Sequence, residues 1–108
     1  NANKFIINIL DASITKKNIL NDDAKKYEEK NIFLYEVSIL VEYELYDDNG
    51  YLIANTTVES YRSTTSQKYI SLNDVDNIIN ELVLNSLIDF TNESQIMLKK
   101  YMSAYLVN

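Results

Sequence analysis

The clearest pattern in the chain is a strict alternation of apolar and polar residues between Ile32 and Tyr46. Odd positions are apolar or aromatic from Phe33 to Leu45, whereas glutamate and serine recur at even positions. A period of two residues is typical of a half-buried antiparallel strand, because successive side chains point to opposite faces of the sheet. We therefore expect a strand here, with its odd-numbered side chains in the core.

A hairpin turn is expected directly after this strand. The sole glycine, Gly50, ends the run of residues 47–50, Asp-Asp-Asn-Gly, and suits the position of a hairpin that requires a positive φ. The next strand is predicted over residues 51–62. Pairing Tyr46 with Tyr51 places the apolar side chains of both strands on one face, so turn chemistry and hydrophobic pattern agree.

The N-terminal part predicts a third strand followed by a loop. Residues 5–14 are rich in isoleucine and apolar at both odd and even positions, which is typical of an interior strand that is buried on both faces. Residues 16–30 are polar and densely charged, and we expect a loop with a helical turn near residues 22–26. A shorter polar link is expected over residues 63–68.

The C-terminal third predicts one long helix from Leu72 to about Leu106. Ser71 is a suitable N-cap, and Asp74 and Asp76 suit the positive end of the helix dipole. We expect the helix to continue through residues 91–92 and its last turns to extend past the sheet. The sheet-facing stripe is expected to contain Leu72, Val75, Ile79, Leu82, Ser86 and Phe90, flanked by Ile78, Val83 and Leu87.

These elements predict a single α+β domain over residues 1–108, in which an antiparallel sheet of about three strands packs on one long C-terminal helix. The length allows one hydrophobic core. The overhanging helix end makes Tyr101, Tyr105 and Leu106 candidates for a contact with a protein partner or a second copy, or else a cap on the end of the core.

Composition removes several classes of function. The formal net charge is −6, and Arg62 is the only arginine, so binding to nucleic acid is not expected. The chain has no cysteine and no histidine, which removes thiol chemistry, the commonest general base and the commonest transition-metal ligand. We expect no enzymatic activity, no cofactor and no metal site.

Three groups of residues could nevertheless carry chemistry. Asp47 to Asn49 could begin a calcium loop, but the ligand spacing favours a plain turn. Glutamates at even positions share one strand face and could form an acid/base pair, but nothing else in the sequence builds a pocket around them, and solvated positions on the outer face are the favoured explanation. Three of the nine tyrosines are predicted on the outer face as a binding patch, with cross-strand packing as the alternative. These residues are Glu36, Glu42 and Glu44, and Tyr46, Tyr51 and Tyr61.

The start of the chain suggests that the native protein is longer at this end. Asn1 and Ala2 resemble the remnant of a cleaved tag, and an upstream signal peptide or lipidation segment is expected in the native protein. The sequence contains no apolar run long enough to span a bilayer. Membrane association is therefore expected only through a lipid anchor upstream of these residues.

Three segments carry a resemblance to a family. They are the Ile-Leu-Asp-Ala-Ser-Ile core at residues 9–14, the hairpin around the Asp-x-x-Gly turn with the Arg62-Ser63 pair near the end of its second strand, and the long C-terminal helix. Together they resemble the C-terminal part of small, uncharacterised envelope lipoproteins of alphaproteobacteria. The resemblance implies a periplasmic domain that assists outer-membrane or transport assemblies, and it implies no catalytic residue.

We therefore expect a non-enzymatic, lipid-anchored protein of the bacterial envelope that acts through protein contacts, including self-association as a homodimer. Its expected location is the periplasm, with the outer membrane as the site of the lipid anchor. Two alternatives stay open. One is a carrier of a small ligand or lipid held between sheet and helix, and the other is a cytoplasmic adaptor domain.

Overall fold

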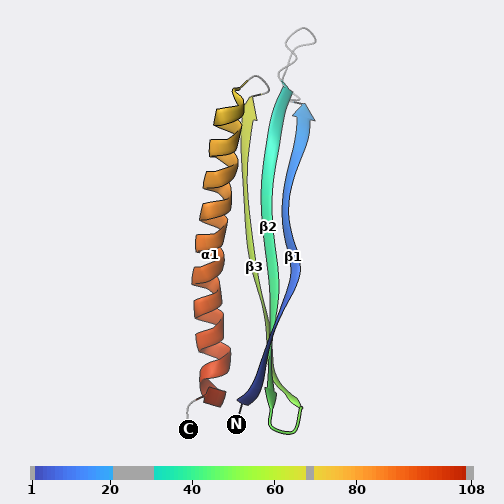
Figure 1. Ribbon diagram of the computed structural model, residues 1–108, viewed down its shortest axis with the longest axis vertical. Coiled ribbons are helices and arrows are strands. Elements are labelled where there is room, and N and C mark those ends of the chain that lie inside the picture. Colours follow the sequence, from blue (N-terminus) through green and yellow to red (C-terminus); the bar gives the residue numbers. More distant parts are fainter. Residues whose placement is uncertain (1, 21–30, 68–69, 107–108) are drawn as a thin grey trace.

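The computed structural model describes residues 2–20, 31–67 and 70–106 and shows three long strands beside one long helix (Figure 1). The strands are β1 (Ala2–Leu20), β2 (Asn31–Asp47) and β3 (Leu52–Gln67), and the helix is α1 (Leu72–Leu106). The strands form one antiparallel sheet in the order β1-β2-β3. The molecule measures 67 × 24 × 18 Å. This confirms the predicted two-layer α+β architecture.

The central strand β2 is the strand that the alternating pattern predicts. Its odd-numbered side chains face the helix, and five of them are buried, whereas its even-numbered side chains are only half-buried on the opposite face. Tyr35 is 1% exposed and Leu45 is 3% exposed. The core is built on the following side chains: Tyr35, Val37, Val41, Tyr43 and Leu45 from β2, Val58 from β3 and Leu82 from α1.

The prediction of an interior strand over residues 5–14 is wrong. β1 pairs only with β2 and is an edge strand of the sheet. It also continues through Leu20, so residues 16–20, expected as loop, belong to a strand. The backbone pairing with β2 continues to Leu20, which lies opposite Asn31, and this pairing stabilises the polar stretch as a strand. The helical turn expected near residues 22–26 lies outside the described residues.

The hairpin forms where predicted, but its register differs from the prediction. The closing pair is Asp47 with Tyr51, whose backbone hydrogen bond is 2.9 Å long, and not Tyr46 with Tyr51. A bulge after Leu45 adds a further residue on β3, so that Leu45 lies opposite Ala54. The total offset is two residues, which preserves the faces because the side-chain period is also two. β3 then continues to Gln67 through the predicted polar link.

The helix begins and continues as predicted. The backbone N–H of Asp74 donates to Oγ of Ser71 at 3.1 Å, which is the expected N-cap. The helix is unbroken at Thr91, whose hydroxyl donates to the carbonyl of Leu87. The predicted overhang is wrong, because the strands are longer than expected: 35 helical residues span roughly 52 Å and the 17 residues of β2 about 56 Å. The helix ends short of the hairpin tip (Figure 1).

Small side chains lie between the sheet and the helix at the centre of their interface. Ser60 of β3 and Ser86 of α1 are both buried, and the Ser60 hydroxyl donates to the Ser86 carbonyl at 2.8 Å. On either side of this contact lie two apolar clusters, one around Val41, Tyr43 and Val58 and the other around Tyr35, Val37 and Leu82. Close approach of the helix to β3 at the serines therefore fixes where α1 lies on the sheet.

Candidate functional site

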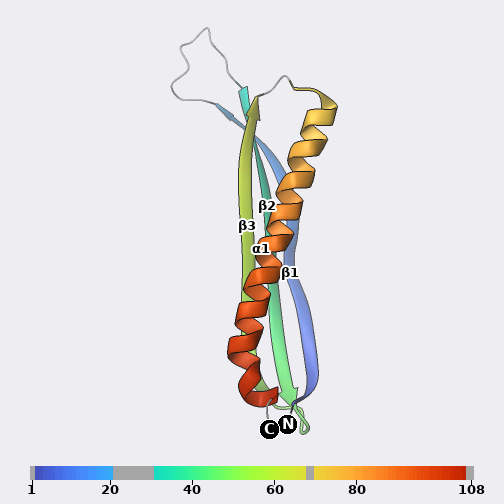
Figure 2. The ribbon, with the colours of Figure 1, turned by 90° about the vertical axis from the view of Figure 1, so that its left-hand side faces the viewer.

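The helix covers only part of the face on which it lies. It packs mainly against β3 and to a smaller extent against β2. The two apolar clusters contain residues of β2, β3 and α1 but none of β1. Viewed from the helix side, α1 crosses the sheet obliquely, and β1 lies clear of the helix in the lower part of the view (Figure 2). One strand of the sheet therefore presents its helix-side face without a helix over it.

The side chains on that part of β1 are large, apolar and exposed. Ile9 is paired with Val41 on the same face, yet Ile9 is 71% exposed and Val41 is 4% exposed. Ile7 is 56% exposed beside Tyr43, its buried neighbour on β2. We call this surface the open face of β1, and it consists of Phe5, Ile7, Ile9 and Ile14.

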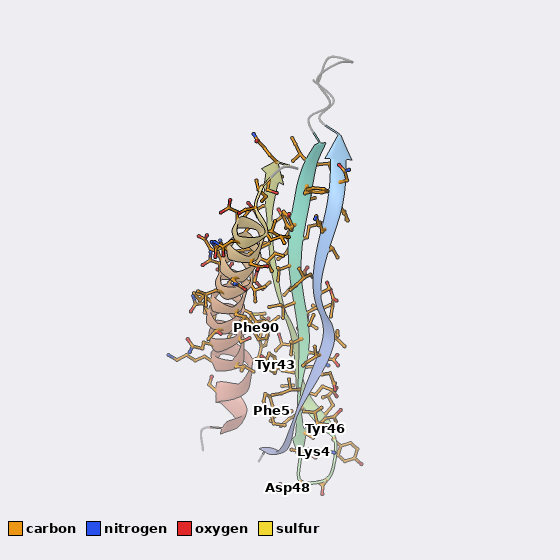
Figure 3. The ribbon with its side chains drawn as sticks, turned by 45° about the horizontal axis from the view of Figure 1, so that its top comes forward. Lys4, Phe5, Tyr43, Tyr46, Asp48 and Phe90 are labelled. Atoms are coloured by element: carbon orange, nitrogen blue, oxygen red, sulfur yellow. The ribbon has the colours of Figure 1, made fainter. Side chains whose placement is uncertain are left out.

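At both ends of the open face, side chains of β1 contact aromatic rings of β2. The Phe5 ring stacks on Tyr43 with 5.7 Å between the ring centroids, and Phe90 of the helix lies near this pair (Figure 3). At the other end the ammonium group of Lys16 lies 4.2 Å from the centroid of Phe33. The apolar stretch is thus bounded by a cation and contains no charge between Phe5 and Ile14 on this face.

The helix carries a second apolar surface that does not face its own sheet. Leu84 is 58% exposed, and Leu87 and Ile88 are each 48% exposed. Leu84 and Ile88 are one turn apart and point away from the buried Leu82 and Ser86. Apolar residues on two sides of a helix are typical of a helix that is covered on more than one side.

The opposite face of the sheet is polar and its carboxylates are already bound. Glu42 accepts hydrogen bonds from the amides of Asn8 at 3.1 Å and Asn55 at 3.2 Å. The Asn55 bond, followed by that from Asn8, lowers the pKa of Glu42 below its ordinary value. The Glu44 carboxylate accepts from Asn8 and from the hydroxyl of Tyr46. A general acid needs a raised pKa, so the lowered pKa of Glu42 is typical of a structural carboxylate.

Glu36 is held in the same way further along the sheet. It accepts a 2.5 Å hydrogen bond from the Tyr61 hydroxyl and forms an ion pair with Lys17 at 2.9 Å. The Tyr61 bond and then the Lys17 bond lower the pKa of Glu36, and the same contact raises the pKa of Tyr61. Each partner is thereby kept in its usual charge state.

The structure does not bring the predicted tyrosines into one patch. Tyr46 lies near the turn, where its hydroxyl donates to Glu44 and its pKa is raised by that bond. Tyr51 is exposed at the turn itself. Tyr61 pairs with Ser38, about eight residues or roughly 26 Å along β2 from Tyr46. Tyr61 and Tyr46 therefore bind different carboxylates and do not form a common surface.

Of the C-terminal candidates, only Tyr101 has a described side chain. It is 41% exposed, and it lies seven residues after Ser94, whose hydroxyl is 3.0 Å from that of Tyr43 on β2. Leu87 lies seven residues before Ser94, so all three occupy the helix stripe nearest β2. Tyr105 and Leu106 belong to α1, but their side chains lie outside the described residues.

The predicted turn accounts for the acidic residues that could begin a calcium loop. Oδ1 of Asp47 accepts from the backbone N–H groups of Asn49 at 2.8 Å and Tyr51 at 2.9 Å. Gly50 has φ of +83°, as the turn requires. Within residues 2–20, 31–67 and 70–106, no group of three acidic side chains is placed to hold a metal ion.

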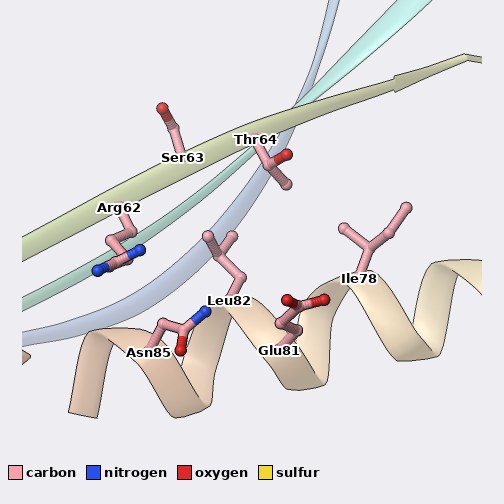
Figure 4. Close-up of a pocket in the computed structure, with 7 residues that line it drawn as sticks. All are labelled: Arg62, Ser63, Thr64, Ile78, Glu81, Leu82 and Asn85. Carbon is pink, nitrogen blue, oxygen red and sulfur yellow. The ribbon is translucent and has the colours of Figure 1, made fainter. Parts of the chain in front are cut away.

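A hollow lies where the free edge of β3 meets the helix, on the side away from β1 (Figure 4). Its charged residues are Arg62 and Glu81, but the Arg62 guanidinium is engaged by Asp89 through contacts of 2.5 and 3.1 Å. This ion pair lowers the pKa of Asp89. The hollow is open to solvent at the edge of the layers and borders the second apolar cluster, because Ile78 and Leu82 belong to both.

No protein-family model, no curated protein and no solved structure matches the chain. The resemblance to envelope lipoproteins therefore stays a prediction. Among the described residues, no helix is long and apolar enough to cross a membrane.

Sequence reasoning missed the open face of β1 and the outward residues Leu84 and Ile88. Both left a signal in the pattern. Residues 5–14 are apolar at both parities, and the helix has apolar residues outside its sheet-facing stripe. From the sequence we expect burial on both faces for residues 5–14 and assign no role to Leu84 and Ile88, whereas the structure leaves large apolar side chains of both groups at the surface.

Proposed function

We propose that the chain is a non-enzymatic domain that works through protein–protein contacts and that its partner binds the open face of β1. The observation that supports this is the exposure of four large apolar side chains along one strand, beside a helix that covers only the rest of the sheet. Contiguous apolar surface of this kind marks interaction sites in soluble proteins. The polar face supports no competing catalytic proposal, because the three glutamates considered for acid/base chemistry, Glu36, Glu42 and Glu44, are bound to asparagine, tyrosine and lysine.

We place this domain in the bacterial envelope, anchored by a lipid, on the strength of the sequence resemblance alone. Fractionation of cells that express the full-length gene, with mass spectrometry of the mature N-terminus, tests the location. A lipid-modified cysteine in the membrane fraction is expected. An unmodified protein in the cytosol would instead favour the alternative of an adaptor domain there.

The binding surface is tested by photo-crosslinking in cells. A photoreactive phenylalanine analogue replaces Ile9 at the centre of the open face or, as the matched control, Thr57 on the opposite face of the same sheet. Both positions are exposed, so the substitution leaves the core intact. We expect a discrete covalent adduct with a protein from position 9 and none from position 57. Equal labelling at the two positions, or no protein adduct at position 9, would contradict the proposal.

A further inference from the structure

We infer that the occupant of the open face is a second copy of the chain, whose α1 lies over β1 and whose β1 is covered in return. This inference names the partner in the function proposed above and rests on it. Each chain has one strand that lacks a helix and one helix that has an extra apolar surface. A two-fold axis between two copies pairs these two surfaces twice, since residue i of one copy contacts residue j of the other and the reverse also holds.

The resulting arrangement is a three-layer assembly with both helices between two sheets. One side of each helix packs on β2 and β3 of its own chain. The opposite side, which we call the outward stripe and which includes Leu84 and Ile88, contacts β1 of the partner copy. The flank of the helix, with Leu87 and Tyr101 on the stripe nearest β2, meets the partner helix at the centre of the layer. A three-stranded sheet is about 14 Å wide and one helix is about 10 Å wide, so α1 leaves roughly one strand uncovered, and a partner helix that lies over β1 extends past the edge of the sheet.

Charge supports a second copy as the partner. The chain has a net charge of −6, so two copies repel each other at long range, and a stable contact between them must add no like charges at close range. The outward stripe of α1 contains no charged residue over more than six turns, although the helix has acidic and basic residues on its flanks. The members of this stripe are all exposed: Asn73, Asn77, Asn80, Leu84, Ile88, Thr91 and Gln95. The open face of β1 is equally uncharged.

The available area is sufficient for a stable dimer. The open face contributes four apolar side chains, and Leu84, Leu87, Ile88 and Tyr101 contribute four from the helix, with exposures between 41% and 71%. At roughly 100 Å² for each half-exposed side chain, these residues offer on the order of 800 Å² per copy. This is the area that each partner contributes to a protein interface of standard size.

Sedimentation equilibrium of the full chain tests the inference. We expect a species of twice the 12.5 kDa chain mass. Ile9→Lys and Leu84→Lys each place a charge in one half of the interface, and each should weaken the dimer roughly 100-fold or more, because an unpaired ammonium group would be buried. Thr57→Lys adds the same charge to the opposite face and should leave the dimer unchanged. Circular dichroism of the variants checks that each is folded.

The contact between strand and helix is tested by crosslinking a mixture of unlabelled and nitrogen-15-labelled protein, with the photoreactive analogue at position 9. Mixed-isotope adducts between position 9 and residues 84–95 are expected. A chain that stays monomeric at millimolar concentration, or a dimer that crosslinks β1 to β1, would overturn the inference. If the chain is monomeric, an adduct between position 9 and a different protein in cells would still support the proposed function. The absence of any such adduct would contradict both the proposed function and the dimer.

Discussion

Two serines on the same helix have opposite roles. Ser86 is completely buried, and among the described residues its Oγ has no hydrogen-bond partner. Ser94 is buried as well, but its Oγ lies 3.0 Å from the hydroxyl of Tyr43. A buried hydroxyl without a partner destabilises the folded state, whereas a satisfied one contributes to its stability.

Replacing each serine by alanine should therefore change stability in opposite directions. Ser86→Ala removes an unsatisfied polar group and improves helix propensity, so we expect a gain of about 1 kcal/mol in the free energy of unfolding. Ser94→Ala leaves the buried Tyr43 hydroxyl without its partner, and we expect a loss of about 1 kcal/mol. Urea denaturation followed by circular dichroism measures both. Equal effects of the two substitutions would contradict this assignment.

The hydrogen-bonded carboxylates on the polar face predict a loss of stability in acid. Asn55 and Asn8 lower the pKa of Glu42 from its ordinary 4.5, so their contribution is complete above that pH and declines as the pH falls through the lower, folded-state pKa. Thermal unfolding should therefore show a midpoint that decreases below about pH 4.5. Glu42→Gln cannot titrate and should reduce this decrease, whereas Glu59→Gln, on an exposed position of the same face, controls for the change in net charge. An unchanged acid profile in Glu42→Gln would count against the network.

At the scale of elements, the sequence predicts most where local pattern and tertiary burial coincide. In β2, the alternation from Phe33 to Leu45 matches the burial of its odd positions. In α1, the serine N-cap and the burial of Leu82 and Ser86 in the predicted stripe are confirmed, whereas Leu72, predicted in the same stripe, is 85% exposed in the first turn of the helix. The hydrophobic pattern does not predict the exposure of β1, because apolar residues give the same pattern whether they are buried within the chain or exposed for contact with a partner.

The hairpin offers a test of a single element. Gly50 has a positive φ, and a Cβ added there would meet no atom within 4 Å, so the effect of a side chain is conformational and not steric. Gly50→Ala should cost about 1 kcal/mol of stability, which is the penalty of the left-handed region for an ordinary residue. Gly50→Asn should cost less, because asparagine tolerates this region. Chemical denaturation measures the free energy of unfolding of both variants. Equal losses in the two would show that the turn relaxes to another conformation.

At the scale of the whole molecule, the candidate site results from a mismatch between the layers. Three strands form a sheet that is wider than one helix, and the serine contact between Ser60 and Ser86 places that helix over β3 and β2. Neither fact can be read from the sequence, since the strand order and the lateral position of the helix depend on long-range packing. The open face of β1 therefore becomes visible only once the sheet and the helix are placed together.

Net charge gives the proposed dimer a characteristic dependence on salt. Each chain has a charge of −6, whereas the surfaces inferred to meet are uncharged, so the electrostatic contribution to association is mainly long-range repulsion. Raising the ionic strength from about 0.01 M to about 0.15 M shortens the Debye length from roughly 30 Å to roughly 8 Å and screens this repulsion. We expect the dissociation constant, measured by sedimentation, to fall roughly fivefold over this range. An interface made by ion pairs, for example between Lys16 and carboxylates of a partner copy, would weaken instead. The sign of the salt effect therefore distinguishes an apolar contact through the open face from a contact through charged surfaces.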